Sequence, residues 1–222
     1  LAPLFGDRVT PASLPPLEAE TRTVYEVFLR HQSPDNRLQL GANLFYNDIS
    51  DPTLEARTTL PNGEDQSVII NGDQAKLYGL EVSADYQATE RLRVFGALGV
   101  LRSELTRFDA SPEVEGNELR EAPKYTLSLG FDWSVTQRFS FGGDVSFVDG
   151  YFSDFTNDPI NAVPSRTLVT LNTSYDLTDG VELYGYVDNV FDQSSPQFLF
   201  SAGSRGVLTK PREIGIGLRA TF

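Results

Sequence analysis

The sequence predicts an all-β protein in which antiparallel strands form a β-barrel that crosses a membrane. Three observations predict this fold. Apolar and polar residues alternate in one segment after another, the connections between these segments are short and long in turn, and aromatic residues concentrate toward the segment ends. The period is two, as in a strand, and not 3.6, as in a helix. A sheet with one apolar and one polar face suits a boundary between lipid and water.

The last eleven residues show the alternation most clearly. One face of this extended segment carries Ile214, Ile216, Leu218, Ala220 and Phe222, and the other carries Glu213, Gly215, Gly217, Arg219 and Thr221. Eight earlier segments repeat the pattern, so we expect about nine strands. They are residues 21–30, 38–47, 78–86, 92–100, 125–135, 139–147, 166–177 and 183–191.

Connection length separates the two ends of the expected sheet. Short turns are expected at 33–36, 88–90, near Gln137 and at 179–180, and long connections at 49–74, 105–122, 149–164 and 193–210. Short turns on one rim and long loops on the other are typical of bacterial outer-membrane barrels. Within 49–74, Val68, Ile69 and Ile70 form either a local hairpin or the start of the next strand.

Aromatic residues on the apolar face are expected to form two girdles at the membrane interfaces. Near the long loops these are Tyr46, Tyr78, Tyr125 and Phe191, and near the short turns Tyr86, Trp133, Tyr175 and Phe222.

Composition excludes several function classes. The net charge of -13 argues against nucleic acid as a partner. With 0 Cys and 1 His, the chain has no disulfide framework, no thiolate nucleophile and no histidine cluster for a metal. The single histidine, His31, lies beside a short turn, where it is more plausible as an exposed turn residue than as a base. We therefore expect no enzyme activity, catalytic residue, metal site or cofactor.

A carboxy terminus in the periplasm would place the long connections outside the cell. Residues 1–19 then form an extracellular loop segment, and residues 20–222 form barrel strands. An odd strand count that begins outside implies that earlier strands are missing. We therefore expect an open sheet in which residues 212–222 do not pair with residues 20–30.

Candidate ligand contacts lie in the aromatic and acidic connection 149–164, since aromatic faces and side-chain carbonyls suit a sugar or a cyclic ligand. They are Tyr151, Phe152, Asp154, Phe155, Asn157 and Asp158. The alternative is an acidic rim loop near lipopolysaccharide and divalent cations. Lumen carboxylates are expected to pair with arginines or to line a transport path; they are Glu81, Asp85, Asp132, Asp144 and Asp188, opposite Arg22, Arg30, Arg93, Arg166 and Arg219.

Several stretches in order resemble the carboxy-terminal part of TonB-dependent outer-membrane receptors. They are Leu44-Phe45-Tyr46-Asn47-Asp48-Ile49, Tyr78-Gly79-Leu80-Glu81, Glu121-Ala122-Pro123-Lys124-Tyr125, the stretch from Tyr184 to Asp192, and Pro211-Arg212 before the last strand. The stretch from Tyr184 to Asp192 ends in Asn189-Val190-Phe191-Asp192, which is similar to the family's NLFD element. The resemblance implies a bacterial outer-membrane location and a 22-stranded barrel, of which this chain is the carboxy-terminal portion without the plug domain.

The resemblance also implies a function and a set of partners. Such receptors import a scarce nutrient (siderophore-iron, haem, cobalamin or an oligosaccharide) with energy delivered by TonB, ExbB and ExbD. The expected partners are the protein's own plug domain, lipopolysaccharide and other outer-membrane lipid, and the barrel assembly machinery. That machinery reads a final strand such as the one carrying Ile214, Ile216, Leu218, Ala220 and Phe222. A passive porin or structural barrel is the alternative, followed by a soluble β-domain that binds a small molecule in its core.

Overall fold

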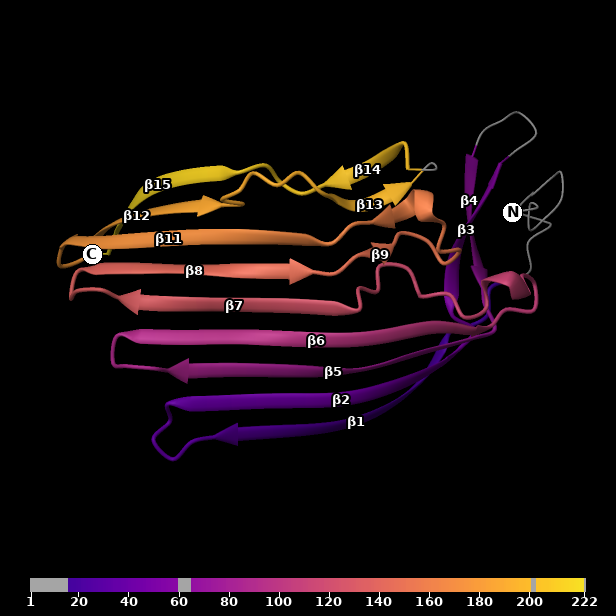
Figure 1. Ribbon diagram of the computed structural model, residues 1–222, viewed down its shortest axis with the longest axis horizontal. Coiled ribbons are helices and arrows are strands. Elements are labelled where there is room, and N and C mark those ends of the chain that lie inside the picture. Colours follow the sequence, from indigo (N-terminus) through magenta and orange to yellow (C-terminus); the bar gives the residue numbers. More distant parts are fainter. Residues whose placement is uncertain (1–15, 60–64, 201–202, 222) are drawn as a thin grey trace.

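A computed structural model describes residues 16–59, 65–200 and 203–221. Nine strands form one antiparallel sheet in the order β1-β2-β5-β6-β7-β8-β11-β12-β15 (Figure 1). The predicted antiparallel fold of about nine strands is therefore confirmed. The strands are β1 (Thr21–Gln32), β2 (Leu38–Ser50), β5 (Gln74–Gln87), β6 (Leu92–Arg107), β7 (Tyr125–Ser134), β8 (Phe139–Val148), β11 (Arg166–Thr178), β12 (Val181–Asp188) and β15 (Glu213–Ala220).

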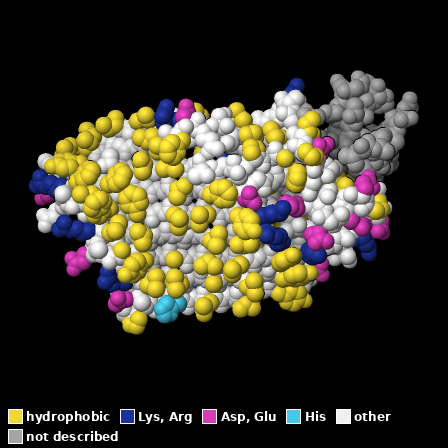
Figure 2. Space-filling model, in the orientation of Figure 1, with side chains coloured by type: hydrophobic (Ala, Val, Ile, Leu, Met, Phe, Trp, Pro, Cys, Tyr) yellow, Lys and Arg dark blue, Asp and Glu magenta, His cyan; other side chains and the backbone are white. Residues whose placement is uncertain are grey.

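The strand register sorts the side chains into two faces. One cross-strand row joins Leu40, Ala84, Gly96, Leu129, Val145 and Val169, and the adjacent row joins Gly41, Ser83, Ala97, Ser128 and Ser146. We call the side that carries the first row the apolar face and the opposite side the polar face. Hydrophobic side chains cover the apolar face (Figure 2). Leu129 is 49% exposed and Ile216 is 78% exposed, as expected for side chains whose solvent is lipid.

The sheet is open. In the described part of the chain, β1 pairs only with β2 and β15 pairs only with β12. The prediction that residues 212–222 do not pair with residues 20–30 is confirmed for residues 212–221, and Phe222 lies outside the described residues. Because two edge strands carry unpaired backbone groups, each edge must be covered before the sheet can lie in hydrocarbon.

Long and short connections lie at opposite ends of the strands, the long ones at the right in Figure 1. Three small hairpins form within the long connections: β3 (Thr53–Thr59) with β4 (Asp65–Asn71), β9 (Tyr151–Phe152) with β10 (Ala162–Val163), and β13 (Pro196–Phe200) with β14 (Arg205–Leu208). Val68, Ile69 and Ile70 lie in β4, so the local hairpin is the correct one of the two alternatives. Two 3-10 turns, η2 (Pro112–Val114) and η3 (Pro159–Asn161), complete the loops. No helix in the described ranges is long and apolar enough to cross a membrane.

Several strand boundaries differ from the sequence-based expectation, most clearly those of β6 and β12. β6 continues to Arg107, because the upper part of β5 pairs with it as far as Gln74. β12 ends at Asp188, and Phe191 lies beyond it in a turn where Asn189 and Asp192 have positive φ angles of 49° and 51°. Phe191 is thus not part of a strand. The connection 193–210 also contains a hairpin, β13–β14, that alternation alone did not indicate.

Close packing on the polar face depends on glycines beneath aromatic rings. The Phe45 ring lies over Gly79, the Phe95 ring over Gly130 and the Tyr186 ring over Gly215. A Cβ added at Gly79 would lie 2.2 Å from the Val100 carbonyl oxygen and 2.7 Å from Cζ of Phe45. Since neither the backbone nor a packed ring can move freely, these positions require glycine.

We expect Gly79→Ala to lower the free energy of unfolding by about 1–3 kcal/mol, the usual cost of forcing an extra carbon into a packed site. The matched control is Gly185→Ala, because a Cβ there would meet its nearest atoms at 3.5 Å and 3.8 Å. Urea unfolding of the detergent-solubilised protein measures the free energy of unfolding of both variants. Equal stability of the two variants would contradict the packing argument.

Candidate functional site

In the described ranges, buried hydrophobic side chains concentrate at the long-connection end of the sheet, in the connections and the adjoining strand ends. We call residues 51–59, 65–73, 108–122 and 149–165 the loop block. Leu105 and Ala75, at the ends of their strands, have no exposed surface, and Phe108 packs edge-on against Phe155 with ring centroids 6.0 Å apart. Among the described residues, the cluster consists of Ile49, Leu54, Val68, Ile70, Ala75, Leu105, Phe108, Val114 and Phe155. Burial of these side chains stabilises three connections that are far apart in the sequence.

Hydrogen bonds and an ion pair also join the three loops. The Asn157 side chain accepts from the Glu118 backbone N–H at 2.7 Å and donates to the Glu118 carbonyl at 2.9 Å. Asn157 has φ 54°, a conformation that asparagine tolerates better than most residues. The Arg120 guanidinium bonds Glu55 of β3 at 2.6 Å. The three connections of the loop block are therefore joined by hydrogen bonds and an ion pair as well as by the apolar cluster.

Within the loop block, Ser111 orients the first acidic residue of η2. The Ser111 hydroxyl donates to the Glu113 carboxylate at 2.6 Å and thereby lowers the pKa of Glu113 from its ordinary value. Glu113 is solvent-exposed, so it contributes a negative charge to the loop surface at neutral pH.

The six residues predicted to contact a ligand all lie in the loop block, and most of them bond within it. The Tyr151 hydroxyl donates to the Gln197 carbonyl at 2.5 Å, and Phe155 is 2% exposed. Asp154 accepts from Asn161 at 2.6 Å, and Asp158 caps η3 by accepting from the Ile160 N–H at 3.0 Å. Phe152 is partly exposed, and its carbonyl accepts from the Glu121 N–H at 2.8 Å. Ligand contact by these residues stays a prediction.

A recess of about 270 Å³ lies where the loop block meets the polar face of the sheet. Leu77, Leu101 and Leu119 line its apolar part, and Phe155 also contributes. Its polar rim carries two arginines, each with a carboxylate partner: Arg120 bonds Glu55, and Arg22 bonds Glu20 at 2.9 Å. Apolar walls with a few fixed charges suit an organic ligand that presents both apolar and polar groups.

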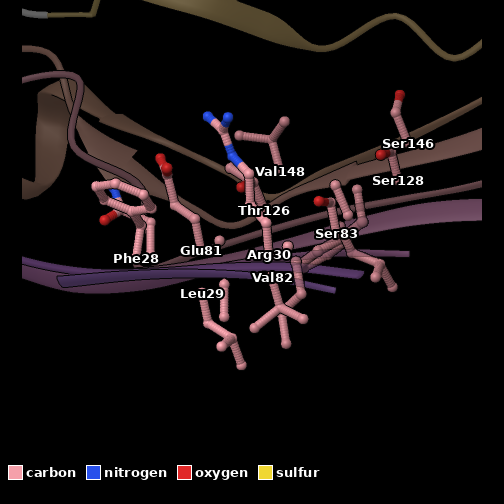
Figure 3. A pocket seen from close by; sticks show the side chains of 18 of the residues that line it. Phe28, Leu29, Arg30, Glu81, Val82, Ser83, Thr126, Ser128, Ser146 and Val148 are labelled. Carbon is pink, nitrogen blue, oxygen red and sulfur yellow. The ribbon is translucent and has the colours of Figure 1, made fainter. Parts of the chain in front are cut away.

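A larger groove, of about 790 Å³, runs along the polar face of β1, β2, β5, β6 and β7. Glu81, Arg30 and Thr126 point to this side, whereas Leu29 and Val82 point to the opposite side of the sheet (Figure 3). The side-chain oxygen of Asn43, which lines the groove, is buried and has no hydrogen-bond partner among the described residues. The groove therefore presents polar side chains, among them one amide oxygen that no described residue satisfies.

Part of the predicted charge pairing on the polar face is confirmed. Arg93 bonds Asp85 and also bonds Asp132, at 3.0 Å, so one guanidinium joins three neighbouring strands. Arg219 also forms an ion pair, at 2.7 Å, but its partner is Glu182, which is not one of the predicted carboxylates. In contrast, Arg30 stacks over the Phe28 ring and Arg166 bonds the Tyr151 hydroxyl. Asp144 has no ion pair within the described ranges.

The residues that sequence reasoning missed are the apolar ones that join the loops, such as Leu54, Phe108 and Val114. A signal was present, because apolar residues in an otherwise polar connection need burial. Nothing in the spacing, however, indicates which loop packs against which.

The final strand matches the expected alternation at Ile214, Ile216, Leu218 and Ala220, all of which lie in β15. Their side chains are largely exposed on the apolar face of an edge strand. Phe222 lies outside the described residues. Recognition of this strand by an assembly machinery stays a prediction.

We expect Phe155→Ala to loosen all three loops together, since it removes the ring that joins Phe108 to the rest of the cluster. A buried aromatic replaced by alanine costs about 3–5 kcal/mol of local stability. Hydrogen exchange of β3–β4 and of residues 112–122 should then accelerate, although neither segment is mutated. Ile160→Ala is the control, because Ile160 lies in the same loop and is 50% exposed. Acceleration confined to residues 149–165 would show that the loops move independently.

Comparison with known proteins identifies the family. Residues 1–190 match the family model described as TonB dependent receptor-like, beta-barrel. A curated relative is the iron-regulated outer membrane virulence protein of Vibrio cholerae, which is 26% identical over 190 residues, covering 81% of this chain and 28% of the relative.

Two solved structures share the fold. The siderophore receptor PiuA of Acinetobacter baumannii aligns with a TM-score of 0.76 and 18% identity, covering 90% of this chain and 28% of that one. The ferric yersiniabactin uptake receptor FyuA of Yersinia pestis aligns with a TM-score of 0.74 and 20% identity. This alignment covers 91% of this chain and 30% of the FyuA chain. The chain thus spans less than a third of the length of these relatives, and its sheet corresponds to a section of their barrel wall. It belongs to the family of TonB-dependent receptors, the β-barrel proteins of the bacterial outer membrane.

Proposed function

We propose that the chain forms part of the barrel wall of a receptor that imports a scarce metal complex, in the first instance a siderophore-iron complex, across the outer membrane. Family membership is the observation that carries this proposal. The names of the three relatives support the choice of cargo, since each refers to iron or to a siderophore. Haem, cobalamin and oligosaccharides are the other cargo classes that the family resemblance implies.

In this proposal the long connections face the outside of the cell, and the loop block forms one wall of the ligand entrance. The recess between the loop block and the polar face then lies on the path inward, with Arg22 and Arg120 at its rim. Because the loops share a core, their surface is preorganised, which reduces the entropy lost when a ligand binds.

The polar face would line the lumen and receive the plug domain. Its groove offers hydroxyl, carboxylate and guanidinium groups, and the free oxygen of Asn43 would accept one further hydrogen bond. Import would be driven by TonB, ExbB and ExbD acting on the plug. The barrel wall itself carries out no covalent chemistry in this proposal.

Growth on ferric siderophores as the sole iron source tests the proposal in a strain that lacks its other iron receptors. Expression of the receptor that contains this chain should restore growth on at least one ferric siderophore, and deletion of tonB should abolish it. Uptake that persists without TonB and depends only on the size of the solute would instead support a passive porin.

A matched pair of variants tests whether the recess takes part in import. Arg120→Gln should weaken import by removing a rim charge and its bond to Glu55. Arg138→Gln, in the short turn between β7 and β8, should leave import unchanged. Equal import by the two variants would exclude a role for the rim.

A further inference from the structure

A break in strand pairing joins the β13–β14 hairpin to β12 and β15. The ladder between β12 and β15 ends at Asp188, and pairing resumes in the hairpin at Pro196. Residues 189–195 on one side of the break lie opposite the shorter stretch 209–212 on the other. Figure 1 shows the hairpin beyond β12 and β15, at the end with the long connections. We call residues 189–195 and 209–212 the joint.

Side chains of the joint take the place of the interrupted ladder. The Asn189 side-chain oxygen accepts from the Gln193 N–H at 2.9 Å, and its amide nitrogen donates to the carbonyls of Gln193 and Lys210 at 3.0 Å and 2.9 Å. The Thr209 hydroxyl accepts from the Ser195 N–H at 3.1 Å and donates to the Gln193 carbonyl at 2.8 Å. Asn189 and Thr209 thus bond the two sides of the joint to each other.

The joint is buried although it is polar. Asn189, Ser195 and Thr209 are only 6%, 5% and 6% exposed. Buried polar groups cost free energy unless they have hydrogen-bond partners, and a buried network whose members are bonded is rigid. Asn189 also has a φ angle of 49°, which asparagine tolerates better than most residues. We therefore expect the joint to hold the hairpin at a fixed angle to the barrel wall.

The hairpin in turn contacts the connection 149–165. The Gln197 carbonyl of β13 accepts from the Tyr151 hydroxyl at 2.5 Å, and the Leu199 N–H donates to the Ser153 hydroxyl oxygen at 2.9 Å. Both Tyr151 and Ser153 are buried, and both belong to the connection that carries the predicted ligand contacts. A shift of the hairpin must either break these two bonds or move the connection with it.

We propose that Asn189 is a positioning residue: its amide fixes the angle of the hairpin, and the hairpin sets the position of the connection 149–165. The hydrogen bonds of Asn189, its burial between wall and hairpin, and the bonds from the hairpin to the connection carry this proposal. In the proposed function the connection faces the ligand entrance, so Asn189 acts on ligand binding without contacting the ligand. That consequence rests on the proposed function, whereas the position of the hairpin does not.

Distances between two spin labels in the intact receptor test the joint by electron paramagnetic resonance. One label is placed at Val207, which is 54% exposed in β14, and the other at Glu90, an exposed residue of the short turn between β5 and β6. The wild type should give one narrow distance distribution. Asn189→Gly keeps the positive φ angle accessible and removes the three side-chain hydrogen bonds, so it should roughly double the width of the distribution.

Asn36→Gly is the matched control. Asn36 also has a positive φ angle, of 58°, and its side-chain oxygen accepts from the Gln32 side chain, but it is exposed in a short turn at the opposite end of the strands. This variant should keep the wild-type distribution. If Asn189→Gly does not fold, Thr209→Val decides the outcome, because it removes the hydroxyl that bonds Gln193 and Ser195 and should broaden the distribution as well.

Hydrogen exchange tests the second step, from the hairpin to the connection. In Asn189→Gly, peptides from 149–165 should exchange roughly tenfold faster, as expected when a buried polar network is weakened. Tyr151→Phe should accelerate the same peptides and leave the spin-label distances unchanged, because the joint stays intact.

A wild-type distance distribution in Asn189→Gly, even with lower global stability, would overturn the proposal. A broadened distribution with wild-type exchange in 149–165 would overturn it as well, because the hairpin would then not position the connection. Failure of the receptor to import any ferric siderophore would refute the proposed function and would leave the distances and exchange rates as they are.

Discussion

The need to satisfy every backbone hydrogen-bonding group in hydrocarbon is the constraint on which the rest of the structure depends. Lipid offers no hydrogen-bond partner, so each strand inside the sheet must pair on both sides. The nine-strand ladder meets this condition from β2 to β12 and leaves only β1 and β15 with one partner each. Strand pairing in turn sends successive side chains to opposite faces, which is why one face can be apolar and the other polar.

The same constraint explains why the hydrophobic core lies outside the barrel wall. Apolar side chains in the wall face lipid and are therefore exposed in the isolated chain, as Leu44 and Leu218 are. Burial among the described residues is found instead in the loop block and the adjoining strand ends, where Leu105 of β6 and Phe155 take part in one cluster. The membrane thus stabilises the wall, whereas the apolar cluster stabilises the long connections.

Sequence patterns predicted the parts of this structure that are local. The alternation of apolar and polar residues along 125–135 and 212–222 was enough to predict β7 and β15. A strand with lipid on one side and water on the other must alternate apolar and polar side chains. The β13–β14 hairpin was missed because its short strands pair only with each other in a long connection. Phe191 was placed in a strand because alternation says nothing about the positive φ angle of Asn189 that ends β12. The candidate site was harder to predict, because contacts such as Asn157 with Glu118 join loops far apart in the sequence, and periodicity carries no information about such pairs.

The two-faced wall is the central claim, and spin labels at adjacent residues of β7 test it most directly. Residues 1–222 contain 0 Cys, so a single cysteine at Leu129 or at Ser128 can be labelled without removing others from this part of the receptor. In lipid bilayers, electron paramagnetic resonance should show the label at Leu129 accessible to oxygen dissolved in lipid and protected from a water-soluble nickel chelate. The label at Ser128 should be protected from dissolved oxygen. Equal accessibility at the two positions, or the reverse order, would contradict the assignment of the apolar face to lipid.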